Sequence, residues 1–303
     1  MDDRRATLIV NPAATTTSPE LRDLIAAALG GSVDLDIRLT TGRGHATELA
    51  AAAVDRGDRA VVVLAGDGTI NEAVQALAGG STALGIVPGG GANVLVRALG
   101  LPAEPVAATA RLLGALREDR RRRIGLGRAG ARLFTFAAGL GFDAAVARRV
   151  EAHPRRKRRL RHAAYALGAV DEWRAGPHAR GVLRAEVDGV VTGPFTLALV
   201  GNASPWSALG PVPLVVHPGA SFDRGLDLLT VAPTGFVGLA AVLAGALAGG
   251  RHLALPGVAH RSDLDGLTLR ADVPLPVQVD GDPLEPAAEV AFTAVPAALD
   301  VLV

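Results

Sequence analysis

Residues 60–72 read AVVVLAGDGTINE, and this stretch predicts the fold of the N-terminal part of the chain. Residues 61–65 are continuously apolar, as in a strand that is buried on both faces of a parallel sheet. Gly66, Asp67 and Gly68 then predict a tight turn. Apolar residues at helical spacing follow the turn, namely Ile70, Ala73, Val74 and Leu77. The stretch is therefore expected to form a strand, a glycine turn and a helix.

The glycine turn is suited to binding a phosphate group. It would leave bare backbone N–H groups at the N-terminus of the helix, where an anion is favoured. Asp67 is unusual at such a place, because a carboxylate beside a phosphate makes sense if it holds a metal ion or takes a proton. A plainer interpretation stays open, in which Asp67 only stabilises the turn. Thr69 and Glu72 also have the spacing of a capping box at the start of the helix.

Residues 6–101 alternate between strand and helix patterns, which indicates a parallel sheet with helices on both faces. Ligands of such folds lie at the carboxyl ends of the strands. Polar or glycine-rich turns follow four expected strands, and these turns begin at Asn11, Thr40, Gly66 and Pro88. We expect them to converge on one crevice. The turn after the first strand is not the G-x-G-x-x-G dinucleotide fingerprint, and the chain has no G-x-x-x-x-G-K-[ST] loop.

After Arg117 the sequence pattern becomes mostly β, with frequent Gly and Pro, as in an antiparallel sandwich. Strands are expected over residues 124–127, 133–137, 181–187, 195–200, 226–231, 267–270 and 277–279. Helices are expected over 144–150, after a glycine turn at 139–143, and over 236–247. The last apolar runs, 289–293 and 299–303, could return to the first domain.

We therefore expect an α/β protein of two domains. The first is a Rossmann-like parallel-sheet nucleotide domain over residues 1–119, completed by 287–303. The second is an antiparallel β-sandwich domain over residues 120–286, which would take the substrate. A length of 303 residues allows two domains of ordinary size, and 49% hydrophobic residues can fill their cores.

Composition excludes several classes of function. Aromatic residues make up only 3% of the chain, which argues against a stacking platform for nucleic acid. The net charge is +1, so the chain has no general attraction to polyanions, and it has no cysteine for a disulfide or a thiolate metal site. The N-terminus lacks the apolar segment of a signal peptide, and the longest apolar stretch, residues 236–249, is interrupted by glycines. We expect a cytoplasmic protein.

Three sets of residues could carry phosphoryl transfer: residues 66–72, the loop 88–93, and the late Asp280-Gly281-Asp282. The reaction needs backbone N–H groups for phosphate, carboxylates for Mg²⁺ and a base for the acceptor hydroxyl. The motifs NPAA at 11–14, GDGTINE at 66–72, PGGGAN at 88–93 and VDGDPL at 279–284 resemble the bacterial diacylglycerol/lipid kinase family. That family is related to sphingosine kinases and, distantly, to NAD kinases. The resemblance covers essentially the whole chain.

The resemblance implies ATP and Mg²⁺ as cosubstrates, a lipid hydroxyl as acceptor, and a site in a cleft between the two domains. Asp67 would act near the phosphates as a ligand of the metal bound to ATP or in proton handling. Asp282 would be the general base. The residues that would hold the nucleotide are Asn11, Thr40, Gly66, Asp67, Gly68, Thr69, Asn71, Glu72, Gly90, Gly91 and Asn93.

Three residues depart from the family pattern. Gly91 stands where the P-x-G-T-x-N loop usually has threonine, and Asp282 stands where the proposed base is usually glutamate, one methylene longer. Arg224 stands where an aspartate usually holds a structural Mg²⁺; either Asp223 substitutes with a shift, or the site is lacking, which we favour. Asp282 could also be only a hairpin-turn residue, because Asp-Gly pairs commonly form turns.

Two basic runs extend from Arg120 to Arg123 and from Arg155 to Arg161. Such runs are ordinarily solvated, but clusters of this density fit docking on anionic lipid headgroups, at about 1 kcal/mol per basic residue. The expected function is therefore an ATP-dependent lipid kinase that contacts the membrane peripherally and binds no nucleic acid. The alternatives are an NAD-kinase-like enzyme with a soluble substrate and a catalytically weak nucleotide- or lipid-binding protein. The acceptor lipid and the oligomeric state, a homodimer included, stay open.

Overall fold

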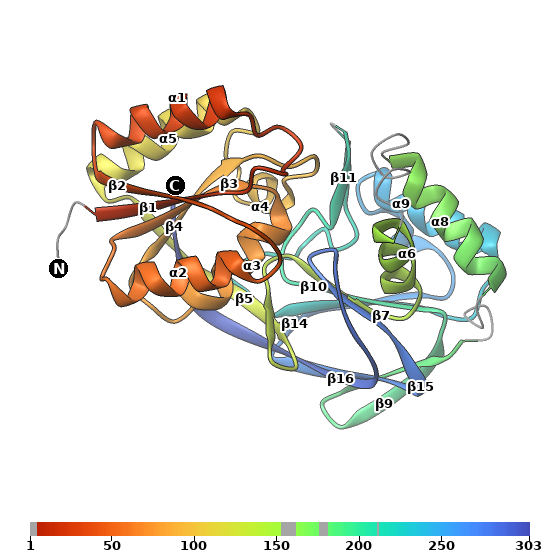
Figure 1. Cartoon of the computed structure of the whole chain (residues 1–303). Coiled ribbons are helices and arrows are strands. Elements are labelled where there is room, and N and C mark those ends of the chain that lie inside the picture. Colours follow the sequence, from red (N-terminus) through yellow and green to blue (C-terminus); the bar gives the residue numbers. More distant parts are fainter. Residues whose placement is uncertain (1–4, 153–161, 176–180, 211) are drawn as a thin grey trace. The chain divides into compact units, whose positions relative to one another are not determined.

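The computed structural model describes residues 5–152, 162–175, 181–210 and 212–303 (Figure 1). The chain forms two compact units, the first made of Met1–Leu126 with Pro296–Val303 and the second of Gly127–Val295. The basic run from Arg155 to Arg161 lies outside the described residues. Of the helices in the described part of the chain, none is long and apolar enough to span a membrane.

Unit 1 is built on a parallel sheet in the order β2-β1-β3-β4, with the end of β16 beside β4. Figure 1 shows helices α1 and α5 on one face of this sheet and α2 and α3 on the other. The expected alternation of strands and helices is therefore confirmed. The strands are β1 (Arg5–Val10), β2 (Asp34–Leu39), β3 (Ala60–Ala65) and β4 (Ala83–Pro88), and the helices are α1 (Pro19–Gly30), α2 (His45–Asp55), α3 (Asp67–Leu77), α4 (Val94–Ala98) and α5 (Pro105–Glu118).

Burial explains why β3 stands inside this sheet. All six of its residues, Ala60–Ala65, are fully buried, as expected for a strand covered by helices on both faces. Its neighbours β1 and β4 are also buried almost throughout. In the outermost strand, β2, charged and apolar residues alternate, and most of them are exposed. The core of unit 1 therefore lies around β3, and the turn after β3 is fixed on a rigid base.

Unit 2 is built on antiparallel strands in the order β14-β13-β10-β7-β15-β16, with β8 beside β15 and β9 beside β8. The antiparallel β-domain that the sequence predicted is thus confirmed. The other strands of the chain are β5 (Arg121–Ala129), β6 (Arg132–Phe134), β11 (Ser207–Leu209) and β12 (Val212–Leu214). The strands of the main path and its branch are β7 (Ala137–Leu140), β8 (Leu183–Val187), β9 (Val190–Phe195), β10 (Leu197–Gly201), β13 (Leu226–Val231), β14 (Val258–Leu264), β15 (Gly266–Val279) and β16 (Asp282–Leu302).

The described part of unit 2 contains the helices α6 (Phe142–Glu151), α8 (His162–Ala175) and α9 (Phe236–Leu247) and the short 3-10 helix η2 (Arg251–Ala254). The bounds of α9 are those that the sequence predicted. The Trp173 ring of α8 lies against Phe142 of α6 and Phe236 of α9, with ring centroids 6.1 and 6.3 Å apart. These aromatic contacts join the three helices to one another.

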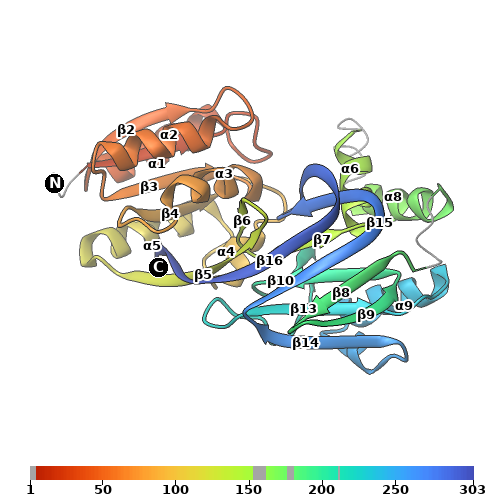
Figure 2. The same ribbon diagram turned by 90° about the horizontal axis from the view of Figure 1, so that it is seen from below.

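The long strands β15 and β16 differ from the expectation. Figure 2 shows them as two extended neighbouring ribbons, whereas the sequence suggested four short strands. Prolines such as Pro274 and Pro286 interrupt the strand pattern, and the pairing shifts register at these interruptions instead of ending. The glycine turn expected at 139–143 is also shorter, because Gly139 and Leu140 belong to β7 and only Gly141 separates that strand from α6.

Candidate functional site

The turns that follow β1, β2, β3 and β4 meet at one edge of unit 1. The strands are parallel, so their carboxyl ends share that edge. After β1, Asn11 Nδ2 donates a hydrogen bond to Thr69 Oγ1 at 3.0 Å, and Thr16 N donates to the Gly89 carbonyl at 3.1 Å. After β2, Thr40 N donates to the Val10 carbonyl at 2.9 Å. The four turns therefore lie at one edge as predicted, while a crevice at that edge stays a prediction.

Two glycines bring the backbones of the β3 and β4 turns into contact. A Cβ atom on Gly90 would lie 2.7 Å from the Cα of Gly66, closer than real side chains approach. Asn93 closes the loop after β4, since its Oδ1 accepts from Gly90 N at 2.9 Å and its Nδ2 donates to the Gly90 carbonyl at 2.8 Å. A Cβ atom on Gly91 would lie in open space, with no atom within 4 Å of it.

Asp67 is the first residue of α3 and is half-buried. Its Oδ1 accepts a hydrogen bond from Leu95 N at 3.1 Å, at the start of α4. The carboxylate therefore links the N-termini of two helices, α3 and α4. This contact supports the plainer interpretation, in which Asp67 stabilises the turn. A carboxylate held at this edge also has the chemistry to accept a proton or to bind a divalent cation.

The capping box expected between Thr69 and Glu72 is wrong. Helix α3 begins at Asp67, and its cap residue is Gly66, which makes no side-chain capping bond. Glu72 instead accepts a hydrogen bond from Ala46 N through Oε2 at 3.2 Å, at the start of α2. Because that partner lies in a different helix, spacing within one helix could not reveal it. Glu72 thus joins α3 to the start of α2.

The remaining predicted nucleotide residues lie along the same helix. Gly68 is the second residue of α3 and is half-buried. Asn71 is fully buried, and its Oδ1 and carbonyl both accept from Gln75 Nε2, at 3.2 and 3.0 Å. Every predicted nucleotide residue therefore lies at the carboxyl edge of the sheet or on the first turns of α3.

In unit 2, Asp280 and Gly281 form the turn between β15 and β16. Both have positive φ angles, 49° and 84°, as in a type I′ hairpin turn, where Asp-Gly is favoured. Asp282 follows the turn as the first residue of β16, half-buried and paired with Val279. The turn itself is thus formed by its two neighbours, while Asp282 stands on the strand.

Asp280 has a structural role that the sequence analysis missed. It is 7% exposed, and its carboxylate accepts hydrogen bonds from the backbone N–H groups of Thr135, Phe136 and Ala137 and from the Thr135 hydroxyl, at 2.7–3.0 Å. Burial raises the pKa of Asp280, and these donated bonds oppose the rise. The contacts fix the hairpin turn against the segment before β7.

Asp143 is a second carboxylate that the sequence analysis gave no role. It is the second residue of α6, after the strand β7 and Gly141, an arrangement similar to that of Asp67 after β3 and Gly66. Gln278 Nε2 donates to Asp143 Oδ2 at 3.0 Å, and Oδ1 is buried with no hydrogen-bond partner among the described residues. Burial raises the pKa of Asp143 to about 6. This carboxyl group therefore keeps its proton to a higher pH than an ordinary aspartate does.

Gln278 connects Asp143 to the hairpin turn, because its Oε1 accepts from Gly281 N at 2.8 Å. Gly139 must remain without a side chain, since a Cβ there would collide with the Asp143 carboxylate. The strand-glycine-aspartate-helix pattern was the signal that could have identified Asp143 in the sequence.

Asp223 and Arg224 lie on an exposed turn before β13. The Arg224 guanidinium is 3.5 Å from Asp263 Oδ2. Among the described residues, Asp223 is not part of any group of three His, Asp or Glu side chains close enough to share a metal ion. Its role as a metal ligand stays a doubtful hypothesis.

The basic run from Arg120 to Arg123 is engaged within unit 1. Arg120 and Arg121 form ion pairs with Glu118 and Asp119, both at 2.9 Å. Arg123 Nε donates to the Ala297 carbonyl at 2.7 Å. These contacts hold the guanidinium groups on the protein's own surface, which weakens the case that this run binds lipid headgroups.

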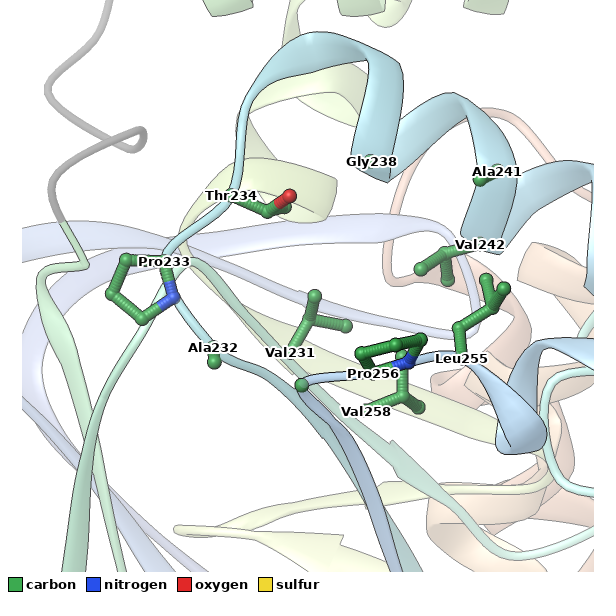
Figure 3. A pocket seen from close by; sticks show the side chains of 11 residues that line it. Val231, Ala232, Pro233, Thr234, Gly238, Ala241, Val242, Leu255, Pro256 and Val258 are labelled. Carbon is green, nitrogen blue, oxygen red and sulfur yellow. The ribbon is translucent and has the colours of Figure 1, made fainter.

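Unit 2 has an apolar pocket of about 250 Å³ between α9 and the ends of β13 and β14. Figure 3 shows the side chains that line it. Its volume is below the roughly 300–1,000 Å³ of typical small-molecule sites. The residues that line it include Val231, Pro233, Thr234, Val242, Leu255 and Pro256.

Two domain families match the chain in order. Residues 5–129 match the diacylglycerol kinase catalytic domain, and residues 137–303 match the YegS C-terminal NAD kinase beta sandwich-like domain. The chain is 31% identical to a probable lipid kinase YegS-like of Pseudomonas aeruginosa, over 99% of this chain and 94% of that protein. It is 35% identical to a protein of the same name from Chromohalobacter salexigens, over 70% and 67% of the two chains.

Solved structures share the fold at lower identity. A putative diacylglycerol kinase from Bacillus anthracis superposes with a TM-score of 0.77 at 20% identity, over 99% of this chain and 97% of that one. An NAD kinase from Archaeoglobus fulgidus in complex with ATP gives a TM-score of 0.56 at 14% identity, over 99% and 93%. With both domains and the full-length relatives in agreement, the chain belongs to the YegS-like family of lipid kinases, which join a diacylglycerol kinase catalytic domain to an NAD kinase-like β-sandwich domain.

Proposed function

We propose that the protein is an ATP-dependent lipid kinase that transfers the γ-phosphate of ATP to a lipid hydroxyl, such as that of diacylglycerol, at a membrane surface. One observation carries the proposal: the turns after β1, β3 and β4 contact one another around Asp67 and the Gly66–Gly90 pair, at the carboxyl edge that these strands share with β2. The full-length relatives named probable lipid kinases support the acceptor class. The chemistry would be served by the following residues.

The nucleotide would lie on the carboxyl edge of unit 1. The first backbone N–H groups of α3 lack partners within the helix, and they favour a phosphate at that end. Gly66, Gly68 and Gly90 have no side chains and so would let phosphate oxygens approach the backbone. ATP would bind as its Mg²⁺ complex, and the Asp67 carboxylate offers the oxygen ligand that Mg²⁺ prefers.

The transfer itself forms one bond and breaks another. The lipid hydroxyl oxygen attacks the γ-phosphorus, and the bond to the oxygen bridging the β- and γ-phosphates breaks, so that its electron pair leaves on ADP. The hydroxyl proton passes to a carboxylate. Asp282 is the proposed acceptor of that proton, and Asp67 is the alternative.

The lipid tail needs apolar surface, and unit 2 offers some on α9. This helix contains only apolar residues and glycine, and Val237 is 81% exposed, with Phe236 and Leu243 also exposed. An apolar face of this kind on a surface helix suits the interface of a bilayer. The neighbouring pocket would accommodate only a part of an acyl chain.

The decisive experiment is a kinase assay with labelled ATP against a panel of lipids in mixed micelles, with Asp67→Asn as the paired variant. Label transferred to a lipid by the native protein and not by the variant supports the proposal. Label transferred only to a soluble acceptor, such as NAD, would replace it with an NAD-kinase-like activity. Binding of ATP without transfer to any acceptor would indicate a nucleotide-binding protein of weak catalytic power.

A further inference from the structure

Three side chains of unit 2 gather at a place that the kinase proposal does not use. They are His217, Asp227 and His260, and their ligand atoms all lie within 4.8 Å of one another. Asp227 belongs to β13 and His260 to β14, while His217 precedes β13. His260 is opposite Leu229, which lies two residues from Asp227 and so on the same face of the strand. The fold itself therefore brings the three side chains together.

Two of the three side chains are deeply buried, and the third, His260, is 19% exposed. His217 and Asp227 are each 1% exposed. Within the described part of the chain, neither ring nitrogen of His217 has a hydrogen-bond partner. Asp227 Oδ2 and His260 Nε2 face each other at 3.2 Å, and neither atom has another partner there. Buried polar groups without partners are rare in native proteins, and an ion is one of the few explanations for them.

The surroundings hold the cluster in place. A Cβ on Gly201, which pairs with Asp227 across the sheet, would collide with the His217 ring. The rings of Trp206 and His260 flank His217, with centroids 5.7 and 5.5 Å away. Gly201 therefore leaves the space that the His217 imidazole occupies, and the neighbouring rings restrict rotation of this imidazole.

We propose that His217, Asp227 and His260 bind a divalent transition-metal ion of the Zn²⁺ class. Two imidazoles and one carboxylate are ligands that Zn²⁺ accepts, and three protein ligands leave a fourth position for water. Mg²⁺ is disfavoured, because it prefers oxygen ligands. This inference is independent of the kinase proposal, since none of the three residues belongs to the proposed nucleotide site.

The test is calorimetric titration of the full chain, first freed of metal with a chelator, with Zn²⁺ in the absence of nucleotide. We expect one equivalent of Zn²⁺ to bind per chain, and Mg²⁺ in large excess not to displace it. Co²⁺ should bind at the same place and give the intense visible absorption of a tetrahedral site. Asp227→Asn should abolish this binding of one equivalent of Zn²⁺. His260→Gln should abolish it too, and this substitution is at a side chain that is 19% exposed.

Asp188→Asn is the matched control, because Asp188 is exposed and pairs with Arg261, the residue after His260. This variant should bind Zn²⁺ as the native chain does. Circular dichroism should first establish that each variant is folded. The proposal is overturned if the folded native chain binds no stoichiometric Zn²⁺, or if folded His260→Gln binds it with unchanged affinity.

Fluorescence gives a second readout that a merely structural cluster would not produce. Co²⁺ should quench Trp206, because its ring lies beside His217. The chain has one other tryptophan, Trp173, so Trp206→Phe should remove most of the saturable quenching. Equal quenching in the native chain and in Asp227→Asn would also overturn the proposal.

Discussion

Gly66 and Gly90 lie so close that neither tolerates a side chain without movement of the other's backbone. A Cβ on Gly90 would be 2.7 Å from Gly66 Cα, and a Cβ on Gly66 would be 3.3 Å from Gly90 Cα. The two turns at the carboxyl edge of unit 1 can therefore pack backbone against backbone only because both positions are glycine.

Gly90→Ala should consequently destabilise the protein by about 1–3 kcal/mol, the usual effect of overpacking. It should also weaken ATP binding, because the two turns must separate. Gly91→Ala is the adjacent control: its Cβ would meet nothing within 4 Å, so we expect a change within about 0.5 kcal/mol. Urea unfolding of the two variants checks the pair, and equal stabilities would contradict the close contact.

Asp67→Asn should leave the fold intact, because the amide oxygen can still accept the hydrogen bond from Leu95 N. Turnover should fall by about 100-fold or more if the carboxylate charge serves the reaction. Asp67→Ala should lose turnover and in addition destabilise the protein, since Leu95 N then has no acceptor. A steady-state assay beside thermal unfolding separates the two effects; native turnover in folded Asp67→Asn would leave Asp67 as a turn residue only.

The sequence predicted unit 1 well because its signals are local. The apolar run of β3, the glycines after it and the helical spacing from Ile70 to Leu77 all lie within one short stretch. The partners of Asp67 and Glu72 could not be predicted in this way. Each carboxylate accepts from the start of another helix, at Leu95 and Ala46, which lie 28 and 26 residues away in the chain.

Unit 2 was less predictable for the same physical reason. The sequence analysis placed Asp280 only in the set Asp280-Gly281-Asp282, but its carboxylate is held by backbone groups about 145 residues earlier, from Thr135 onward. The approach of His260 to Asp227 likewise depends on how β13 and β14 pair, and no spacing within the sequence could predict it. The strand pattern predicted the domain class, while these buried polar contacts required the structure.

Asp143 should make stability depend on pH. Its pKa is raised from 3.8 to about 6 in the folded state, so between these values the unfolded chain ionises first and the folded state loses stability as pH rises. The loss amounts to about 3 kcal/mol at pH 7. Asp143→Asn should remove this loss and be more stable than the native chain at pH 7.

Thermal unfolding from pH 4 to 8 measures the difference in the free energy of unfolding between Asp143→Asn and the native chain. The difference should grow as pH rises towards 6 and be constant above about 7. A flat difference across the range would show that the carboxyl titrates normally.

Contact of α9 with a membrane predicts that Val237→Asp weakens binding to lipid vesicles. The side chain is 81% exposed, so the substitution should not disturb the core, whereas a charge in the bilayer interface is costly. Val190→Asp is the matched control, at a valine that is 59% exposed on β9. Vesicle co-sedimentation checks the pair. Equal binding by both variants and the native chain would argue against α9 as the contact.

The hairpin turn before Asp282 is fixed from two sides, and this bears on its role as general base. The Asp280 carboxylate is bound to the segment from Thr135 to Ala137, and Gln278 Oε1 accepts from Gly281 N. A turn held so firmly cannot easily shift to suit a longer side chain on Asp282. We therefore favour a site that is already adapted to aspartate.

For an adapted site, Asp282→Asn should lower turnover by about 100-fold, because the amide cannot accept the hydroxyl proton. Asp282→Glu should also lower it, since one added methylene displaces the carboxylate by about 1 Å, enough to matter for a base. The kinase assay with unfolding as a control decides among the outcomes. Higher turnover in Asp282→Glu would mean that the native base is poorly placed, and unchanged turnover in both variants would transfer the proton acceptor role to Asp67.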